Sequence, residues 1–161
     1  MDDARRAPAP LDELDQATFE SIYGRVTPWS PADALRVLGD APFRWWVAGG
    51  WSTELDAEPR RHHDDLEIAI PRRDLPALRG WLQAYHLWST FDRGIRYLAP
   101  DDALPDDHDQ LWLRRDATLP WLADLMLTPV DGDTWQYKRD RSLKRPLDDV
   151  NRVRPDGVPV Q

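Results

Sequence analysis

WWVAGGWSTELDAEPRRHHDDLEIAI, residues 45–70, is the stretch of the sequence that decides the predicted fold. The apolar run from Phe43 to Ala48 is too short for a buried helix, and Gly49 and Gly50 follow it directly. A run of this kind predicts a central strand that ends in a tight turn. The whole stretch is expected to fold as strand, glycine turn, short helix, loop and acidic strand. The glycine pair by itself is equally typical of a simple turn without any function.

The end of this stretch, DDLEIAI, alternates between acidic and apolar residues. Asp65 and Glu67 fall on one face of the predicted strand, and the apolar residues between and after them fall on the other. The two carboxylates would then lie about 7 Å apart along the strand. At that spacing they can converge on one or two divalent cations that bind phosphate oxygens and activate a hydroxyl. A solvated edge strand produces the same alternation, so both interpretations stay open.

Length and composition limit the domain organisation and the metal chemistry. We expect residues 1–10, which mix Asp, Arg, Ala and Pro without any period, to form a disordered lead-in. Residues 11–161 are then long enough for one domain with its own core. The sequence contains no cysteine, which excludes disulfides and Cys-ligated zinc. Any bound metal should therefore be a hard cation such as Mg²⁺.

The net charge of −8 limits the classes of partner. Nucleic acid and anionic membrane surfaces would be repelled over most of the molecule, whereas a neutral or cationic small substrate is easily accommodated. No apolar run approaches the roughly 18 residues of a membrane span, and the first residues lack the apolar segment of a secretion signal. The sequence thus predicts a soluble, cytoplasmic protein.

The remaining elements follow from periodicity, capping residues and turn residues. Helical structure is expected over residues 11–26, as one helix or two short turns, and over 31–38, 51–57 and 74–86. Strands are expected over residues 66–70, 87–91, 95–98, 110–114, 121–128 and 134–138. The chain after Asp140 is expected to be irregular and basic.

Asp124 lies inside the apolar run WLADLMLTP. A buried carboxylate is destabilising unless it is paired or bound to a metal, so an acid at this position indicates a functional site. The alternative is an edge strand that lets the side chain reach water.

The stretch that contains both the glycine pair and the acidic strand resembles the nucleotidyltransferase family typified by aminoglycoside 2''-adenylyltransferases, within the DNA polymerase β-like superfamily. The family pattern is an apolar strand, then Gly-Gly-Trp, then Arg-x-His-x-Asp-hydrophobic-Asp/Glu. It falls here on Gly49, Gly50, Trp51, Arg61, His63, Asp65 and Glu67. The resemblance continues more loosely to about residue 150. It implies an α+β fold: a small mixed β-sheet, a polymerase β-like nucleotidyltransferase core, with helices packed mainly on one face.

The resemblance also implies an activity, the transfer of AMP from ATP to a hydroxyl of a small acceptor of the aminoglycoside kind, hence antibiotic resistance. In such enzymes the glycine turn binds the triphosphate, and the Trp, Arg and His of the pattern belong to the nucleotide site. Asp65 and Glu67 would hold Mg²⁺. A third carboxylate from a later strand acts as the general base, for which Asp124 is the candidate and Asp109 the reserve.

Two features of the chain leave another interpretation open. Glu67 stands where the best-known relatives have aspartate, and the domain is expected to be short at its C-terminus compared with them. A shortened, catalytically weak relative that binds nucleotide or a partner would share the same motifs. A His-Asp metal phosphohydrolase built on His62, His63 and Asp64 is a poorer fit, because only His86 and His108 remain as further histidine ligands.

Overall fold

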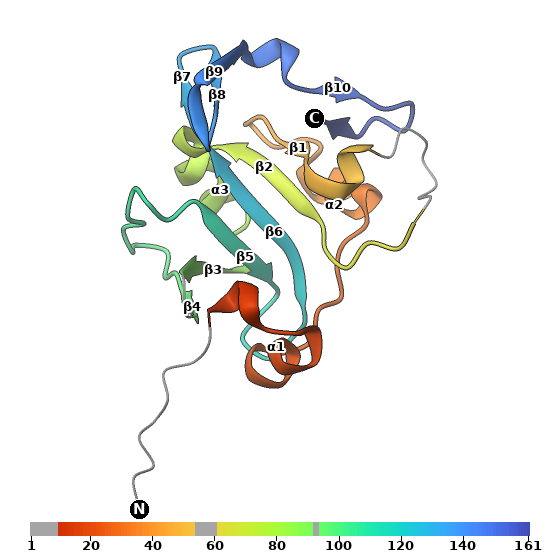
Figure 1. The fold of residues 1–161 in the computed structure, drawn as a ribbon, viewed down its shortest axis with the longest axis vertical. Coiled ribbons are helices and arrows are strands. Elements are labelled where there is room, and N and C mark those ends of the chain that lie inside the picture. Colours follow the sequence, from red (N-terminus) through yellow and green to blue (C-terminus); the bar gives the residue numbers. More distant parts are fainter. Residues whose placement is uncertain (1–9, 54–60, 92–93) are drawn as a thin grey trace, which may run out of the picture.

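A computed structural model describes residues 10–53, 61–91 and 94–161, and its centre is an eight-stranded mixed sheet (Figure 1). The predicted lead-in therefore lies, apart from Pro10, outside the described residues. Across the sheet the strands run in the order β10 (Arg152–Val153), β11 (Pro159–Val160), β1 (Trp46–Val47), β2 (Glu67–Pro71), β6 (Trp121–Thr128), β5 (Gln110–Arg114), β3 (His86–Phe91) and β4 (Gly94–Tyr97). A separate three-stranded sheet consists of β7 (Val130–Asp131), β8 (Thr134–Tyr137) and β9 (Asp140–Pro146).

Strands β1, β2 and β6, which overlap the segments predicted as strands over residues 43–48, 66–70 and 121–128, lie side by side. β1 runs antiparallel to β2, and β2 runs parallel to β6 with Glu67 opposite Asp124. This pairing brings segments that are far apart in the sequence into register. The mixed α+β fold class is thereby confirmed, although the sheet is larger than the small one expected.

Helices α2 (Pro31–Leu38) and α3 (Leu75–Trp81) pack against one face of the sheet (Figure 1). The start of α2 is the one that the sequence predicts: Ser30 Oγ accepts a hydrogen bond from the Asp33 N–H, and the Asp33 carboxylate accepts one from the Ser30 N–H. Such a reciprocal cap satisfies N–H groups that the first helical turn leaves without partners.

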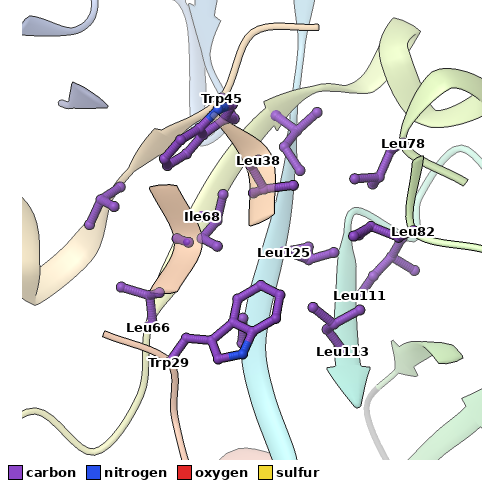
Figure 2. Packing of buried hydrophobic residues seen from close by; sticks show 14 of the residues in the cluster. Trp29, Leu38, Trp45, Leu66, Ile68, Leu78, Leu82, Leu111, Leu113 and Leu125 are labelled. Carbon is purple, nitrogen blue, oxygen red and sulfur yellow. The ribbon is translucent and has the colours of Figure 1, made fainter. Parts of the chain in front are cut away.

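The main core fills the space between these helices and the sheet (Figure 2). Leu38 and Leu78 from the helices meet apolar side chains of the central strands, among them Ile68 and Leu125. These strand residues alternate with Glu67 and Asp124, so burial of the apolar set directs the acids to the opposite face of the sheet.

The opposite face is covered in two places and carries the acids between them. At one end, Phe19 of α1 (Gln16–Tyr23) packs on Trp112 with ring centroids 5.2 Å apart. At the other, Leu147 of the 3-10 helix η4 (Leu147–Asp149) and Val150 pack on Trp46. Of the helices in the described residues, none is long and apolar enough to cross a membrane.

Several boundaries differ from the prediction. The first predicted helix is a 3-10 turn, η1 (Leu11–Glu13), followed by α1. The helix predicted over residues 74–86 ends at Trp81, because residues 82–85 form a turn before β3. The predicted helix over 51–57 is instead a 3-10 helix, η2 (Gly49–Thr53), as far as the described residues reach. The irregular segment expected after Asp140 is wrong, because β9, β10 and β11 form there.

Candidate functional site

The glycine turn lies directly against the acidic strand. Gly49 has φ of +61°, a left-handed conformation that favours glycine, and a Cβ at this position would fall 1.4 Å from Glu67 Oε2. The backbone conformation therefore favours glycine at position 49, and a larger residue there would require the Glu67 carboxylate to move. The Ala48 N–H donates to the Glu67 carbonyl over 2.9 Å, which fixes the start of the turn beside β2.

The Arg/His-rich loop returns over the second glycine. A Cβ at Gly50 would meet Arg61 Nη2 at 3.0 Å and His63 Nδ1 at 3.1 Å. The rings of Trp51 and His63 stack with centroids 4.1 Å apart, and the Trp51 indole N–H donates to the Asp65 carbonyl over 3.2 Å. The structure thus gathers the glycine turn and the Arg-x-His residues into one group beside the acids.

Glu67 and Asp124 lie opposite each other on the parallel strands β2 and β6. Asp65 is exposed and precedes β2, which begins at Glu67, so Asp65 does not lie on the strand with Glu67 as predicted. Its charge still acts on both other carboxylates. β6 is a central strand between β2 and β5, which rules out the edge-strand interpretation of Asp124.

Asp124 is 6% exposed and is held by a chain of side chains. Its Oδ2 accepts a hydrogen bond from Gln110 Nε2 over 2.5 Å, and Gln110 Oε1 accepts one from Thr90 Oγ1 over 3.1 Å. The Thr90 hydroxyl fixes the orientation of the Gln110 amide. Asp124 Oδ1, by contrast, is buried without a hydrogen-bond partner among the described residues. A buried acceptor without a hydrogen-bond partner is destabilising. A proton or a cation bound to this oxygen would remove that destabilisation.

The site is negatively charged, and the pKa values of Asp124 and Glu67 are raised above those of isolated carboxyl groups. The pKa of Asp124 is raised to about 7, first by burial and then by the charges of Glu67 and Asp65, against the lowering effects of the Gln110 hydrogen bond and of Lys138. Burial and the charge of Asp65 also raise the pKa of Glu67. A carboxyl group that titrates near neutrality has the protonation behaviour of a general base.

Asp109, the reserve candidate for the base, lies in a different environment. Its Oδ2 forms an ion pair with Lys138 Nζ over 2.7 Å, and its carbonyl accepts a hydrogen bond from the Leu127 N–H. A carboxylate oxygen already engaged in an ion pair is less available to a substrate hydroxyl. Between the two candidates, the structure therefore favours Asp124.

The donor set fits a hard divalent cation. Asp65, Glu67 and Asp124 offer carboxylate oxygens, the ligands that Mg²⁺ prefers, and Asp124 Oδ1 is an unpartnered one. Within the described residues, however, no group of three or more His, Asp or Glu side chains is placed closely enough to hold an ion as the side chains stand. Metal binding by Asp65 and Glu67 would therefore require these side chains to move.

The four histidines do not form a phosphohydrolase site in the described residues. His62 and Asp64 form an exposed pair, 3.0 Å from Nε2 to Oδ1. His86 packs on Tyr97, and His108 Nδ1 is 2.9 Å from Ser89 Oγ. The structure therefore contradicts the interpretation of His62, His63 and Asp64 as the centre of a metal-bound phosphohydrolase.

Sequence reasoning missed Gln110 and Thr90, the residues that hold Asp124. The signal was present only in part: Gln110 begins a predicted strand whose even-numbered residues, Gln110 and Trp112, alternate with leucines. Nothing in one sequence says that this strand lies beside β6 with Trp112 opposite Asp124.

Comparison with known proteins gives two findings. The model of the family described as Aminoglycoside-2''-adenylyltransferase matches residues 32–106, a span that includes the glycine turn and the acidic strand but ends before Asp124. The chain is also 30% identical, over 106 residues, to an HPr kinase/phosphorylase of Leptothrix cholodnii (strain ATCC 51168 / LMG 8142 / SP-6). That match covers 64% of this chain and 31% of the length of the relative. The family predicted from the sequence is confirmed over residues 32–106, which match aminoglycoside-2''-adenylyltransferases.

Proposed function

We propose that this protein is a Mg²⁺-dependent nucleotidyltransferase that transfers AMP from ATP to a hydroxyl group of a small cationic acceptor of the aminoglycoside kind. The observation that supports it best is the register of β2 and β6, with Glu67 opposite Asp124 and the glycine turn against Glu67. The match to the adenylyltransferase family supports the reaction class. The net charge of −8 favours a cationic acceptor.

Each group has a role in this proposal. The backbone N–H groups of the turn at Gly49 and Gly50 would contact the triphosphate, because glycine itself carries no side chain. Asp65 and Glu67 would hold Mg²⁺, which supplies charge neutralisation at the phosphates and a lowered pKa at the attacking hydroxyl. Trp51, Arg61 and His63 contribute to the nucleotide side of the site.

Asp124 acts as the general base. The acceptor oxygen attacks the α-phosphorus, its proton passes to Asp124 Oδ1, the bond between the α-phosphorus and the bridging oxygen breaks, and pyrophosphate leaves. The Gln110 hydrogen bond holds Oδ2, so the unpartnered Oδ1 is the oxygen available for the proton. With a pKa of about 7, about half of the Asp124 carboxyl groups are deprotonated at neutral pH and can accept the proton.

The decisive experiment incubates the protein with labelled ATP and Mg²⁺ in the presence of a panel of hydroxylated amines. We expect one or more acceptors to gain the mass of an adenylyl group, with release of pyrophosphate. Nucleotide binding without any product from the panel would instead favour a catalytically weak binding protein of the same fold.

The metal ligands can be tested separately from turnover. Asp65→Asn and Glu67→Gln should lose Mg²⁺-dependent ATP binding, measured by calorimetry with and without the ion. Because like charges repel when no metal is bound, each variant should be as stable as the parent or slightly more stable. If both variants unfolded easily yet bound Mg-ATP normally, the acids would be structural.

A further inference from the structure

A second site is suggested by a cleft of about 670 Å³, where β2 and β6 end and the three-stranded sheet begins. A volume of this size lies in the range of small-ligand sites. Glu67 and Asp124 stand four residues before the ends of their strands at Pro71 and Thr128, about 13 Å away at the usual rise per residue. The cleft is lined by Arg72, Arg73, Asp106, Pro129, Val130, Asp131, Gln136 and Arg141.

One wall of the cleft is held in place by Arg72. Its guanidinium donates hydrogen bonds to three backbone carbonyls of one loop, those of His108 at 2.6 Å, Pro105 at 2.7 Å and Leu104 at 3.3 Å. The neighbouring Asp106 carboxylate is 3.9 Å away. Because these bonds fix both the loop and the guanidinium, little ordering remains for a ligand to bring about.

The opposite walls combine a second anchored arginine with uncommitted side chains. Arg73 donates to the carbonyl of Gly132, which ties the β7–β8 turn to the end of β2. Arg141 of β9 and the side chain of Gln136 of β8 also line the cleft. Within the described residues neither makes a hydrogen bond or an ion pair through its side chain. They are therefore available to a ligand.

The charges of the lining indicate the chemistry of that ligand. Three guanidinium groups face two carboxylates, those of Asp106 and Asp131, in a chain that otherwise carries an excess of acid. Guanidinium groups bind phosphate through paired N–H donors, and a phosphate offers enough oxygens to engage more than one of them. We propose that this cleft binds a phosphate-bearing small molecule, separately from the acidic site, with Arg141 as its principal uncommitted ligand.

The test is calorimetric titration of the full chain with phenyl phosphate, in the absence of divalent cations. We expect saturable binding that weakens about tenfold or more in Arg141→Gln, the usual loss for one charged hydrogen bond. Arg145→Gln is the matched control: it changes the same charge on the same exposed strand, but Arg145 does not line the cleft. Its affinity should stay within about twofold of the parent.

Two further titrations distinguish binding in this cleft from binding at the acidic site and test the choice of phosphate. Glu67→Gln should bind phenyl phosphate as the parent does, so the result does not depend on whether the protein transfers nucleotides. Benzoate, with the same ring and a carboxylate, should bind more weakly than phenyl phosphate.

Four results would overturn the proposal: no saturable binding up to about 10 mM, equal weakening in Arg141→Gln and Arg145→Gln, binding unaffected by Arg141→Gln, or binding lost in Glu67→Gln. Benzoate binding as tight as phenyl phosphate would overturn the assignment of phosphate.

Discussion

Asp124 on β6 and Arg114 on β5 are buried charged side chains of neighbouring strands, 6% and 7% exposed, but their surroundings differ. The Arg114 guanidinium lies between the rings of Trp88 and Trp121, 4.0 Å from each centroid. Asp124 instead lies near Glu67 and Asp65, whose like charges raise its pKa. Burial disfavours both charges, since it lowers the pKa of Arg114 and raises the pKa of Asp124. The aromatic faces offset this effect at Arg114, whereas the neighbouring acids add to it at Asp124.

The difference distinguishes a structural charge from a functional one. The aromatic faces around Arg114 attract its charge and belong to a cluster that α1 covers through Phe19 and Trp112. Around Asp124 the protein supplies acids and leaves Oδ1 without a partner, so a cation or a proton from outside would stabilise the site.

The largest expected effect is a change of stability with pH that depends on Asp124. Its pKa is about 7 in the folded protein against 3.8 as an ordinary aspartate, so the folded state holds the proton more tightly. The stability from this group is fully present below pH 3.8 and is lost as the pH rises to about 7. The shift corresponds to about 4 kcal/mol.

The measurement compares urea unfolding of the parent and Asp124→Asn from about pH 4 to about pH 8. The parent should lose stability relative to the variant over this window and then level off. If the two pH profiles are parallel, Asp124 does not carry a raised pKa and the contrast with Arg114 fails.

The second expected effect is the loss of stability when Arg114 is replaced, which should be nearly as large as the effect of pH. Arg114→Ala removes two cation–π contacts and leaves a cavity between Trp88 and Trp121, which should lower the free energy of unfolding by about 3 kcal/mol. Arg115→Ala is the control, because the adjacent Arg115 is exposed and lies over the single ring of Tyr85 at 5.1 Å. It should lose about 0.5–1 kcal/mol in the same unfolding assay. Similar losses in both variants would mean that the two-ring arrangement adds nothing.

A pair of variants tests whether Asp124, rather than the nearby acid Asp109, is the general base. Asp124→Ala should cut the transfer rate by about 10², or about 2.7 kcal/mol of transition-state stabilisation, and leave ATP affinity within a few fold. Asp109→Ala removes an acid that is already paired with Lys138 and should change the rate much less. Single-turnover kinetics with labelled ATP measures both. The reverse ranking would make Asp109 the base.

The smallest expected effect concerns the glycine beside the acids. Gly49→Ala places a methyl group on Glu67 and strains a positive φ, so it should lower stability by about 2 kcal/mol. Gly132→Ala strains a similar φ of +56° with no atom within 4 Å and should lose about 1 kcal/mol. Thermal unfolding of both variants isolates the contact with Glu67. Equal losses would show that Glu67 moves aside freely.

Local patterns predicted those parts of the molecule that local chemistry decides. The start of α2 followed from its cap at Ser30, and β5 and β6 have the predicted bounds because their apolar alternation is regular. The residues of the Gly-Gly-Trp and Arg-x-His patterns were placed in one site by the family resemblance rather than by a local pattern. Strand β9 was missed because all of its residues are exposed, so it carries no apolar face to detect.

Long-range pairing explains the remaining failures. Gln110 can hold Asp124 because β5 lies beside β6. The sequence of β6 alone does not indicate which strands are its neighbours. The two-residue strands β10 and β11 could not be predicted from local sequence either, because their pairing partners supply most of their stability.

The pairing of β1 with β11 also has a consequence for how the molecule folds. β1 has only two paired residues, and its outer partner Val160 is roughly 110 positions later in the chain than Val47. Contacts between such distant segments form slowly, because a long loop must close first. Until they form, β1 exposes an unpaired edge next to the glycine turn, where another chain can attach. During refolding, the strand that positions Gly49 should therefore gain amide-exchange protection late, and aggregation at high concentration should begin at this edge.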